Sequence, residues 1–326
     1  MRKALFTKNN KCMLCPHNCK VLESKKGLCG VRVNKKGVIG TLNYNNPSSL
    51  NIDPIEKKPL YHFNPGKPVF SIGGYGCNFF CSWCQNSSIS KEFEIFNDID
   101  DEKFNPRNIV LMTKENGCDM IAYTYNEPTV FYEYMIDIAK LAKKEGIKNV
   151  IVSNGYINKK PLKKLCKYID AANIDLKFFN EKNHLRYTSG KLSDVLDTLK
   201  ILKKEKVHVE ITNLIIPSIN DDMIDFEKMC AWIKKELGKN TPLHISRFYP
   251  HYKMKDLIPT PVETMNNARN IACKYLDFVY VGNLGVENDT ICPKCKKVVI
   301  LRRGYEVFDK TIKSKCFSCK TKILFL

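Results

Sequence analysis

The organisation of this chain follows from one stretch, Gly73-Gly74-Tyr75-Gly76-Cys77-Asn78-Phe79-Phe80-Cys81-Ser82-Trp83-Cys84-Gln85-Asn86. Its three cysteines follow an apolar run at C-x3-C-x2-C spacing. An electron-transfer [4Fe-4S] cluster normally takes four Cys ligands, so three thiolates on a tight loop leave one iron open to a small molecule. Two other interpretations are a three-ligand zinc site and three unrelated core thiols, although zinc ligands usually occur as CxxC pairs. The pattern favours a cofactor site that performs chemistry.

The length and the cysteine content indicate a broad class. At 326 residues the chain exceeds the roughly 100 to 200 residues of a usual domain, although barrels of about 250 residues fold as one unit. Fifteen cysteines, with no signal-peptide pattern at Met1–Lys8, favour metal sites in a reducing compartment over disulfides. No apolar run approaches the ~18 residues of a membrane span. We expect a soluble, cytoplasmic protein with one large domain and small appendages.

The net charge of +19 is concentrated at the two ends of the chain. Residues 1–40 carry ten Lys and Arg against one Glu, and residues 292–326 carry ten against two acidic residues. Each basic end also contains four regularly spaced cysteines. Four thiolates around a divalent ion or a [4Fe-4S] cluster add a formal charge of about −2. Nucleic-acid binding is therefore possible but not favoured over a solvated basic surface.

Residues 1–40 are predicted to form a four-cysteine metal-binding module. A segment this short has little core of its own, so a metal is expected to fold it. Zinc and a second iron-sulfur cluster both fit the spacing. Residues 41–68, rich in proline and turn formers, are predicted to be an extended connector, and His62 within it is interpreted as a surface histidine. The ligands of the module are Cys12, Cys15, Cys19 and Cys29, with His17 as a fifth candidate.

Residues 69–287 alternate short β-rich runs with amphipathic helical segments. The runs start about 30 residues apart, the length of a βα unit, and so predict a parallel sheet with right-handed crossovers. Curled, such an α/β sheet is a partial or full TIM-type (β/α) barrel. Apolar periodicity predicts three helices. One covers residues 131–142, one begins after a cap at Ser193, and one ends before Gly238. The predicted strands are Val69–Ile72, Met120–Tyr125, Asn149–Asn154, Asn173–Lys177, His208–Ile216, Leu243–Phe248 and Phe278–Asn283.

Polar residues gather near the ends of these predicted strands. In a TIM-type barrel the chemistry lies at the carboxyl ends of the strands. A half-buried strand has no structural need for so many polar residues near one end, so we expect a single polar mouth around the cysteine loop. Its candidates are Asn126, Glu127, Ser153, Asn154, Asp175, Lys177, Glu210, Asn213, His244 and Arg247.

Residues 288–326 are predicted to form a zinc-ribbon or rubredoxin-like module. Two CxxC pairs are twenty residues apart, with an expected strand at Val298–Leu301 between them, and this is a usual ligand pattern of such modules. Zinc and iron both remain open. The ligands are Cys292, Cys295, Cys316 and Cys319, whereas Cys118, Cys166, Cys230 and Cys273 lack partners at ligand spacing and are interpreted as core or helix-face thiols.

The chain resembles a known family over nearly its whole length. The cysteine loop, including Trp83 before the third cysteine, is similar to the signature of the radical SAM superfamily. This loop and the motifs given in the next sentence together resemble the radical SAM enzyme of the AmmeMemoRadiSam system, a relative of the pyruvate formate-lyase-activating enzymes. The other matching motifs are Cys12–Arg32, Asp53–Phe63, Thr124–Thr129, Asn173–Lys177, Asn213–Pro217 with Asn220 and Asp221, and Ser246–Pro250.

The resemblance implies that Cys77, Cys81 and Cys84 bind a [4Fe-4S] cluster whose open iron takes the methionine moiety of S-adenosylmethionine (SAM). Superfamily members contact the methionine amino group with a Gly-Gly-Glu-like turn. At this position the chain reads Tyr125-Asn126-Glu127, which keeps the Glu but lacks both glycines. That departure bears on the backbone contact to SAM.

Six further residues are cofactor-binding candidates by the same resemblance. Ser153 and Asn154 match positions that touch the ribose or the methionine. Asp175 and Lys177 match positions near the methionine carboxylate, where a cation suits the charge. His244 and Arg247 complete the set, although inward-pointing polar residues also suit a substrate.

The activity implied by the resemblance is reductive cleavage of SAM to methionine and a 5'-deoxyadenosyl radical, which takes a hydrogen atom from a substrate. An electron donor such as ferredoxin or flavodoxin supplies the electron. The substrate is an unidentified protein or small molecule, and the activating enzymes suggest a protein. Two alternatives are an RNA-modifying radical SAM enzyme and a zinc-ribbon nucleic-acid-binding protein with an inactive barrel.

Overall fold

The computed structural model describes residues 1–95 and 102–323. These residues form one large sheet with the strand order β13-β12-β11-β10-β9-β8-β7-β6. Strands β7 to β13 are parallel, and β6 pairs antiparallel with β7. The strands are β6 Ser49–Pro54, β7 Pro68–Gly73, β8 Met120–Tyr123, β9 Lys148–Ser153, β10 Ala171–Asp175, β11 His208–Ile215, β12 Leu243–Arg247 and β13 Val279–Gly282.

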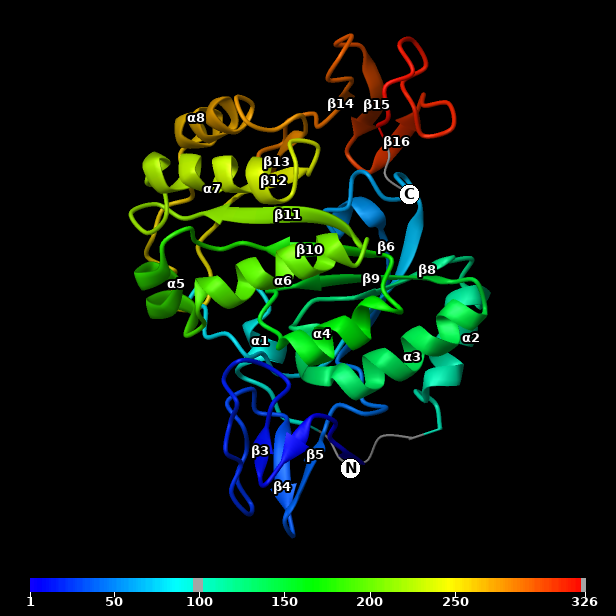
Figure 1. Ribbon diagram of the computed structural model, residues 1–326, viewed down its shortest axis with the longest axis vertical. Helices are drawn as coiled ribbons and strands as arrows, with labels where there is room; N and C mark the ends of the chain where they lie inside the picture. Colours follow the sequence, from blue (N-terminus) through cyan, green and yellow to red (C-terminus); the bar gives the residue numbers. More distant parts are fainter. Residues whose placement is uncertain (96–101, 324–326) are drawn as a thin grey trace.

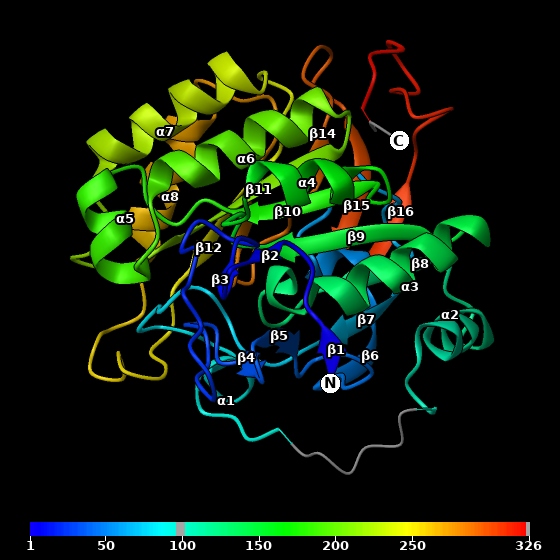
Figure 2. The same cartoon turned by 60° about the horizontal axis from the view of Figure 1, so that its bottom comes forward.

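The sheet is a partial barrel. Strands β6 and β13 are its two edges, and within the described residues they do not pair with each other. Helices connect the parallel strands and lie along the outside of the sheet (Figure 1, Figure 2), as parallel pairing requires. The helices are α1 Ser87–Ser90, α2 Pro106–Glu115, α3 Tyr132–Lys144, α4 Lys159–Cys166, α5 Glu181–Thr188, α6 Leu192–Lys204, α7 Met223–Glu236 and α8 Val262–Ala272, with 3-10 turns η1 Ile55–Lys57 and η2 Pro128–Phe131.

The α/β class and the seven predicted strands are confirmed. Strand β8 shows why the sequence signal was strong, because all four of its residues are buried and a parallel strand covered on both faces reads as a continuous apolar run. The predicted helices correspond to α3, α6 and α7. The cap predicted at Ser193 is wrong: the N-cap of α6 is Lys191 and makes no side-chain cap hydrogen bond.

The segment 41–68 differs from the predicted connector in two ways. Residues 49–54 form β6, an edge strand that lengthens the sheet. The interpretation of His62 as a surface residue is wrong, because its side chain is fully buried. Its Nε2 lies 2.6 Å from the hydroxyl of Tyr280, and its Nδ1 lies 2.8 Å from the carbonyl of Ile323. His62 therefore joins the connector to the C-terminal part of the chain.

Two small modules lie at opposite ends of the molecule (Figure 1). The N-terminal module contains β1 Arg2–Lys3, β2 Thr7–Lys8, β3 Lys11–Cys12, β4 Arg32–Lys35 and β5 Val38–Thr41. The C-terminal module contains β14 Thr290–Ile291, β15 Val298–Arg303 and β16 Glu306–Asp309, which form an antiparallel sheet of their own.

The N-terminal module packs on the carboxyl-end face of the large sheet. The amide of Leu5 donates to Glu133 Oε1 (2.7 Å), at the start of α3, and the amide of Asn158 donates to the carbonyl of Leu14 (3.0 Å), beyond β9. When the bottom of Figure 1 is turned forward, this module lies in front of the strands (Figure 2). The C-terminal module instead contacts residues near the amino ends of the strands, such as Tyr280, the second residue of β13.

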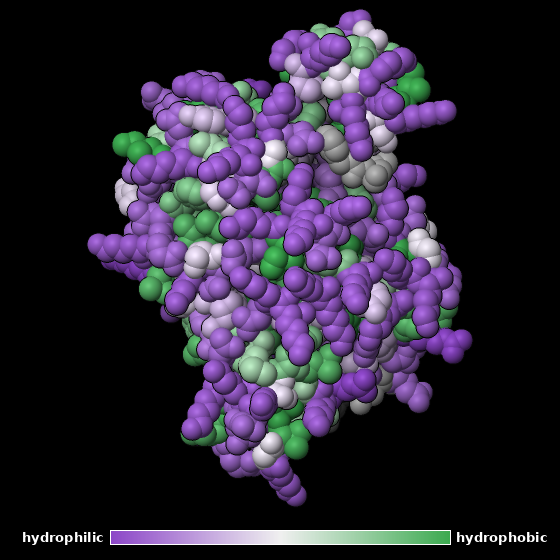
Figure 3. Space-filling view, in the orientation of Figure 1, coloured by the Kyte–Doolittle hydropathy of each residue, from purple (hydrophilic) through white to green (hydrophobic). Residues whose placement is uncertain are grey.

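The surface is mostly polar on the face drawn in Figure 3, where apolar side chains are scattered between charged ones. None of the helices in the described part of the chain is long and apolar enough to cross a membrane.

Candidate active site

A cavity of about 550 Å³ lies at the carboxyl ends of the strands. The structure places nine of the predicted site residues in its wall: Cys77, Cys81, Cys84, Asn126, Glu127, Ser153, Asn154, Asp175 and Lys177. The volume is within the range of about 300 to 1,000 Å³ that is usual for small-molecule sites. The loops after β7, β8, β9 and β10 therefore meet around one space, as a barrel requires.

The cysteine loop follows β7 and is held by one side chain. Asn126 accepts a hydrogen bond from the amide of Gly74 (2.9 Å) and donates to the carbonyl of Gly76 (2.8 Å). Both interactions are buried, so they fix the path of the backbone just before Cys77.

Two lysines oppose the effect of burial on the thiols. Burial raises the pKa of Cys77, and it raises the pKa of Cys81 to about 11, while the charges of Lys91 and Lys177 act in the opposite direction. Lys91 donates to the carbonyl of Cys77 (3.0 Å). A bound metal stabilises the thiolate form further. Lys91 was not predicted as a site residue, because nothing in its sequence position marks it.

In the turn after β8, Tyr125 has a backbone conformation that glycine adopts more readily than other residues. Tyr125 has φ of 68°, in the left-handed region that costs an L-residue about 1–2 kcal/mol. Its carbonyl accepts a hydrogen bond from Asn86 (2.7 Å), and its hydroxyl donates to Asp53 (2.5 Å). These bonds hold Tyr125 in the left-handed conformation that a glycine would adopt without this cost.

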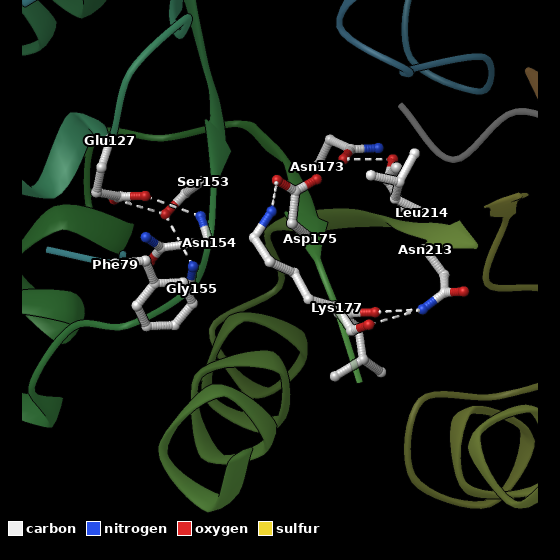
Figure 4. A network of polar contacts seen from close by, with 12 residues as sticks. Phe79, Glu127, Ser153, Asn154, Gly155, Asn173, Asp175, Lys177, Asn213 and Leu214 are labelled. Atoms are coloured by element: carbon white, nitrogen blue, oxygen red, sulfur yellow. Dashed lines mark hydrogen bonds and ion pairs between the residues drawn. The ribbon is translucent and has the colours of Figure 1, made fainter. Parts of the chain in front are cut away.

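Glu127 ties the end of β8 to the end of β9 (Figure 4). Its carboxylate is buried and accepts hydrogen bonds from the amide of Thr129 (2.9 Å), the hydroxyl of Ser153 (2.8 Å) and the amide of Asn154 (2.8 Å). Burial raises the pKa of Glu127, and these hydrogen bonds partly offset that rise. Asn154 also reaches the cysteines, because its Nδ2 lies 3.8 Å from Cys77 Sγ.

A partly buried ion pair lies beside this network. Lys177 Nζ is 2.9 Å from Asp175 Oδ2, and the two side chains point toward each other (Figure 4). Burial alone lowers the pKa of a lysine, but Asp175 and the nearby cysteines raise the pKa of Lys177 above its ordinary value. The amine therefore stays positive in the cavity wall, where it suits a carboxylate of a bound ligand.

His244 and Arg247 do not line this cavity. His244 Nε2 lies 2.7 Å from Glu210 Oε2, near the amino ends of the strands. Arg247 donates to the carbonyl of Thr260 (2.7 Å) and to the hydroxyl of Tyr249 (3.1 Å). For His244, inward orientation on a strand was the sequence signal, and it does not distinguish the two ends of a barrel. Arg247 does end β12 at the carboxyl end, but its guanidinium group is held by the carbonyl of Thr260. Asn213 donates to the carbonyl of Leu176 (2.7 Å) and lies outside the cavity wall as well.

Glu210 is the centre of a second buried polar cluster, at the amino end of the barrel. Its carboxylate accepts from the amides of Tyr61 (3.0 Å) and His62 (2.7 Å) and contacts His208 Nε2 (3.0 Å) and His244 Nε2 (2.7 Å). These partners lower its pKa well below the ordinary value despite burial. The cluster closes the amino end of the barrel. The prediction that Glu210 lies at the polar mouth is therefore wrong.

Another group in the cavity wall was missed. Asp53 pairs with Lys58 (2.7 Å) and accepts from Tyr125, and these bonds outweigh burial and lower the pKa of Asp53 to about 2. Asp53 and Lys58 lie in a proline-rich segment, which hid their position. Both residues belong to the motif Asp53–Phe63, and that resemblance was the one sequence signal that could have placed them near the site.

The C-terminal cysteines can hold a single metal ion. The Sγ atoms of Cys292 and Cys319 are 3.4 Å apart, and those of Cys295 and Cys316 are 3.6 Å apart. All four sulfur atoms lie within 4.8 Å of one another. Tetrahedral ligands at a Zn–S distance of about 2.3 Å are about 3.8 Å apart, so the set matches a mononuclear site.

The chain belongs to the radical SAM superfamily. The model of that superfamily matches residues 71–232. The chain is 42% identical to an uncharacterised protein of Methanocaldococcus jannaschii, with 99% of both chains covered. It is 30% identical to a protein of that organism provisionally named a glycyl-radical enzyme activating enzyme, over 63% of this chain and 77% of the relative.

A solved structure supports the fold. A radical SAM methyltransferase from Sphaerobacter thermophilus is 13% identical, with a TM-score of 0.52 and coverage of 67% of each chain. Superfamily membership makes the protein an enzyme that uses a [4Fe-4S] cluster and SAM. The cavity fits that pair, because its wall combines three thiols with the partly buried ammonium group of Lys177 and the carboxylate network of Glu127.

Proposed function

We propose that this protein is an activase-like radical SAM enzyme that abstracts a hydrogen atom from a protein substrate. Two observations support the proposal. The three cysteines share one cavity with five of the seven predicted SAM-binding residues, and a relative that the chain covers well is provisionally named as an activator of a glycyl-radical enzyme. The cavity is the observation that carries the radical SAM chemistry, and the relative carries the choice of a protein substrate.

Each part of the cavity wall has a role in this proposal. Cys77, Cys81 and Cys84 hold the cluster, and Lys177, paired with Asp175, binds the methionine carboxylate. Glu127 and Asn154 position the amino group and the ribose. When bound, the cluster and SAM supply one-electron cleavage of a sulfonium and a radical able to abstract hydrogen. The chain positions these groups and excludes water through the buried floor around Glu210.

The substrate enters from the open side of the cavity. Lys57 and Gln85 line the cavity and reach the surface, while Lys58 and Asp53 lie deeper. A polypeptide loop can reach the cluster past this polar rim without unfolding the barrel. The electron comes from a low-potential one-electron donor protein such as ferredoxin or flavodoxin.

The test is the formation of 5'-deoxyadenosine from SAM by anaerobically reconstituted protein with dithionite. Wild type should form it, and Cys77→Ala should lose it entirely. Cys273→Ala is the matched control, because Cys273 is exposed and outside the cavity, and it should behave as wild type. Absence of product from iron-loaded wild type, or its retention in Cys77→Ala, would overturn the proposal.

An isotope-labelled substrate distinguishes a protein substrate from an RNA substrate. With a deuterated candidate glycyl-radical enzyme, deuterium should appear in 5'-deoxyadenosine. An RNA substrate would instead show binding that falls steeply with salt, because Lys and Arg at the two ends would neutralise phosphates. Deuterium transfer from RNA and none from protein would replace the activase proposal by RNA modification.

A further inference from the structure

The four cysteines of the N-terminal module surround one cavity. Cys12, Cys15, Cys19 and Cys29 line it together, and Asn78 from the radical SAM loop completes its inner wall. The backbone brings them there through local contacts: the amide of Cys12 donates to the carbonyl of Cys19 (2.8 Å), and the amide of Asn18 donates to the carbonyl of Cys15 (3.0 Å). The ligand set predicted from the sequence is therefore assembled in space.

The sulfur atoms of the N-terminal set are less closely grouped than those of the C-terminal set. Among the described residues, the C-terminal set is the group of cysteines whose sulfur atoms all lie within 4.8 Å of one another. The N-terminal four do not meet that limit, and neither do Cys77, Cys81 and Cys84. A single tetrahedral ion needs its sulfur ligands about 3.8 Å apart. The N-terminal set is therefore more open than the C-terminal set, as a group larger than a single ion requires.

Arg32 lines the same cavity and has unused hydrogen-bond donors. Its side chain is 1% exposed, and its Nη2 lies 2.8 Å from Glu133 Oε2. Its Nε and Nη1 have no hydrogen-bond partner among the described residues. Buried donors without partners are rare and costly. Cluster sulfurs beside them would accept these hydrogen bonds, and such bonds help to set the reduction potential of a cluster.

The cavity lies between the surface and the radical SAM site. On the outer side, Leu28 lines it and is 55% exposed. On the inner side, His17 Nε2 lies 2.8 Å from the carbonyl of Asn78. The side chain of Asn78 in turn accepts a hydrogen bond from Asn154 (2.8 Å), which contacts Cys77.

The backbones of the two cysteine sites also touch. Gly76 packs so closely on the N-terminal module that a Cβ there would lie 2.2 Å from the carbonyl oxygen of Cys29. Residues 76–78 are therefore a shared wall, one layer of residues thick, between two thiol-lined cavities.

We propose that Cys12, Cys15, Cys19 and Cys29 bind a second [4Fe-4S] cluster that accepts one electron from an acidic, low-potential donor protein and passes it to the cluster on Cys77, Cys81 and Cys84. In each transfer the donor centre is oxidised by one electron and the acceptor centre is reduced by one. No bond forms or breaks, and no proton moves. The relay role rests on the proposed function, because it delivers the electron which that activity consumes.

The charge of the module fits the donor. Residues 1–40 hold ten Lys and Arg against one Glu, and Lys20, Lys25 and Lys26, next to the cysteines in sequence, are exposed. An acidic electron carrier would be attracted to this surface, and its binding would weaken with salt.

The first test counts clusters without using activity. Anaerobically reconstituted wild type should contain about eight acid-labile sulfides per chain, and Cys12→Ser/Cys29→Ser and Cys77→Ala should each contain about four. Cys292→Ser/Cys316→Ser should keep about eight, because a single ion carries no sulfide. About four sulfides in wild type, with zinc bound by the N-terminal cysteines, would overturn the proposal.

The second test uses wild type alone and so remains decisive if a cysteine variant fails to fold. Electron paramagnetic resonance of the reduced protein should show two [4Fe-4S] signals. Addition of SAM should change one of them, the signal of the cluster with an open iron, and leave the other unchanged. A single signal that shifts completely with SAM would contradict a second cluster.

The third test isolates the relay. Lys20→Glu/Lys25→Glu/Lys26→Glu, which keeps every cysteine, should form 5'-deoxyadenosine at close to the wild-type rate with dithionite and at least about tenfold more slowly with reduced ferredoxin, because these exposed lysines face the donor and not the cavity. Equal rates with both reductants would leave the cluster without a relay role and sink this inference. Failure of wild type with dithionite would instead count against the proposed function, so the two failures are distinguishable.

Discussion

The N-terminal and C-terminal modules have the same number of cysteines and a buried arginine each, yet the two arginines are used differently. Arg302 donates to the carbonyls of Asn288 (3.0 Å) and Tyr61 (2.8 Å) and to the hydroxyl of Thr290 (2.8 Å). Arg32 is paired with Glu133 and leaves two nitrogens beside the cysteine cavity. One arginine fastens its module to the barrel, and the other is available to a bound group.

The location of the modules follows the same division. The C-terminal module covers the amino end of the barrel, above the Glu210 cluster, and its sulfur atoms are spaced for one ion. The N-terminal module lies at the carboxyl end, against the radical SAM loop. A four-cysteine pattern therefore does not define a function by itself. The two modules differ in their distance from the radical SAM site and in the grouping of their sulfur atoms, and these differences separate their expected roles.

The largest expected effect on stability is that of Glu210→Ala. Removal of the carboxylate leaves two histidines and two amides without a buried partner, and breaking such a cluster costs about 3–5 kcal/mol. The free energy of unfolding in denaturant should fall by that amount. Glu287→Ala, an exposed acid in the same half of the molecule, should change it by less than about 0.5 kcal/mol. A loss below 1 kcal/mol for Glu210→Ala would show that the floor is not held by this cluster.

A pair of glycines compares the two modules directly. Gly76→Ala should cost about 2–4 kcal/mol, because its φ is +82° and the new Cβ meets the carbonyl of Cys29. Gly304→Ala, in the C-terminal module, has φ of +62° and open space around it, so it should cost about 1 kcal/mol. Thermal unfolding measures both. Equal costs would mean that the N-terminal module is not pressed against the radical SAM loop.

The acid dependence of stability should report His62, which joins the C-terminal module to the barrel. Burial lowers the pKa of His62 to about 4, from 6.5 in the unfolded chain. The unfolded state binds more protons between these values, so the stabilisation is present above pH 6.5 and is lost as the pH falls toward 4, by up to about 3 kcal/mol.

His62→Leu provides the comparison, because leucine does not titrate. The difference in unfolding free energy between wild type and His62→Leu should narrow steadily from pH 6.5 to pH 4. A constant difference across that range would contradict a neutral buried His62.

The smallest expected change is that of Arg302→Met. Its hydrogen bonds are buried, but methionine fills much of the same volume, so we expect a loss of about 2 kcal/mol in stability. The visible absorption of the iron-sulfur centres should remain as in wild type. Loss of that absorption would mean that the C-terminal module supports the clusters, and the division between the modules would fail.

Most of the fold could be predicted from the sequence because βα repeats leave strong local signals. Strands such as β8 are apolar throughout, and the polar residues at the ends of β8, β9 and β10 do meet in one cavity. The sequence could not show that His244 and Glu210 lie at the amino end of the barrel, because an inward-facing residue near the start of a strand has the same local pattern as one near its end. Lys91 and Asp53 were missed because their roles depend on contacts between distant segments.

The measurement that tests this account most directly is anomalous diffraction from crystals of the anaerobically reconstituted protein, grown with SAM. The account predicts two multi-iron peaks, one at Cys77, Cys81 and Cys84 with SAM in the adjoining cavity and one at the N-terminal cysteines. It predicts a single-atom peak at the C-terminal cysteines. A single-ion peak at the N-terminal site, or no iron at Cys77, would contradict it.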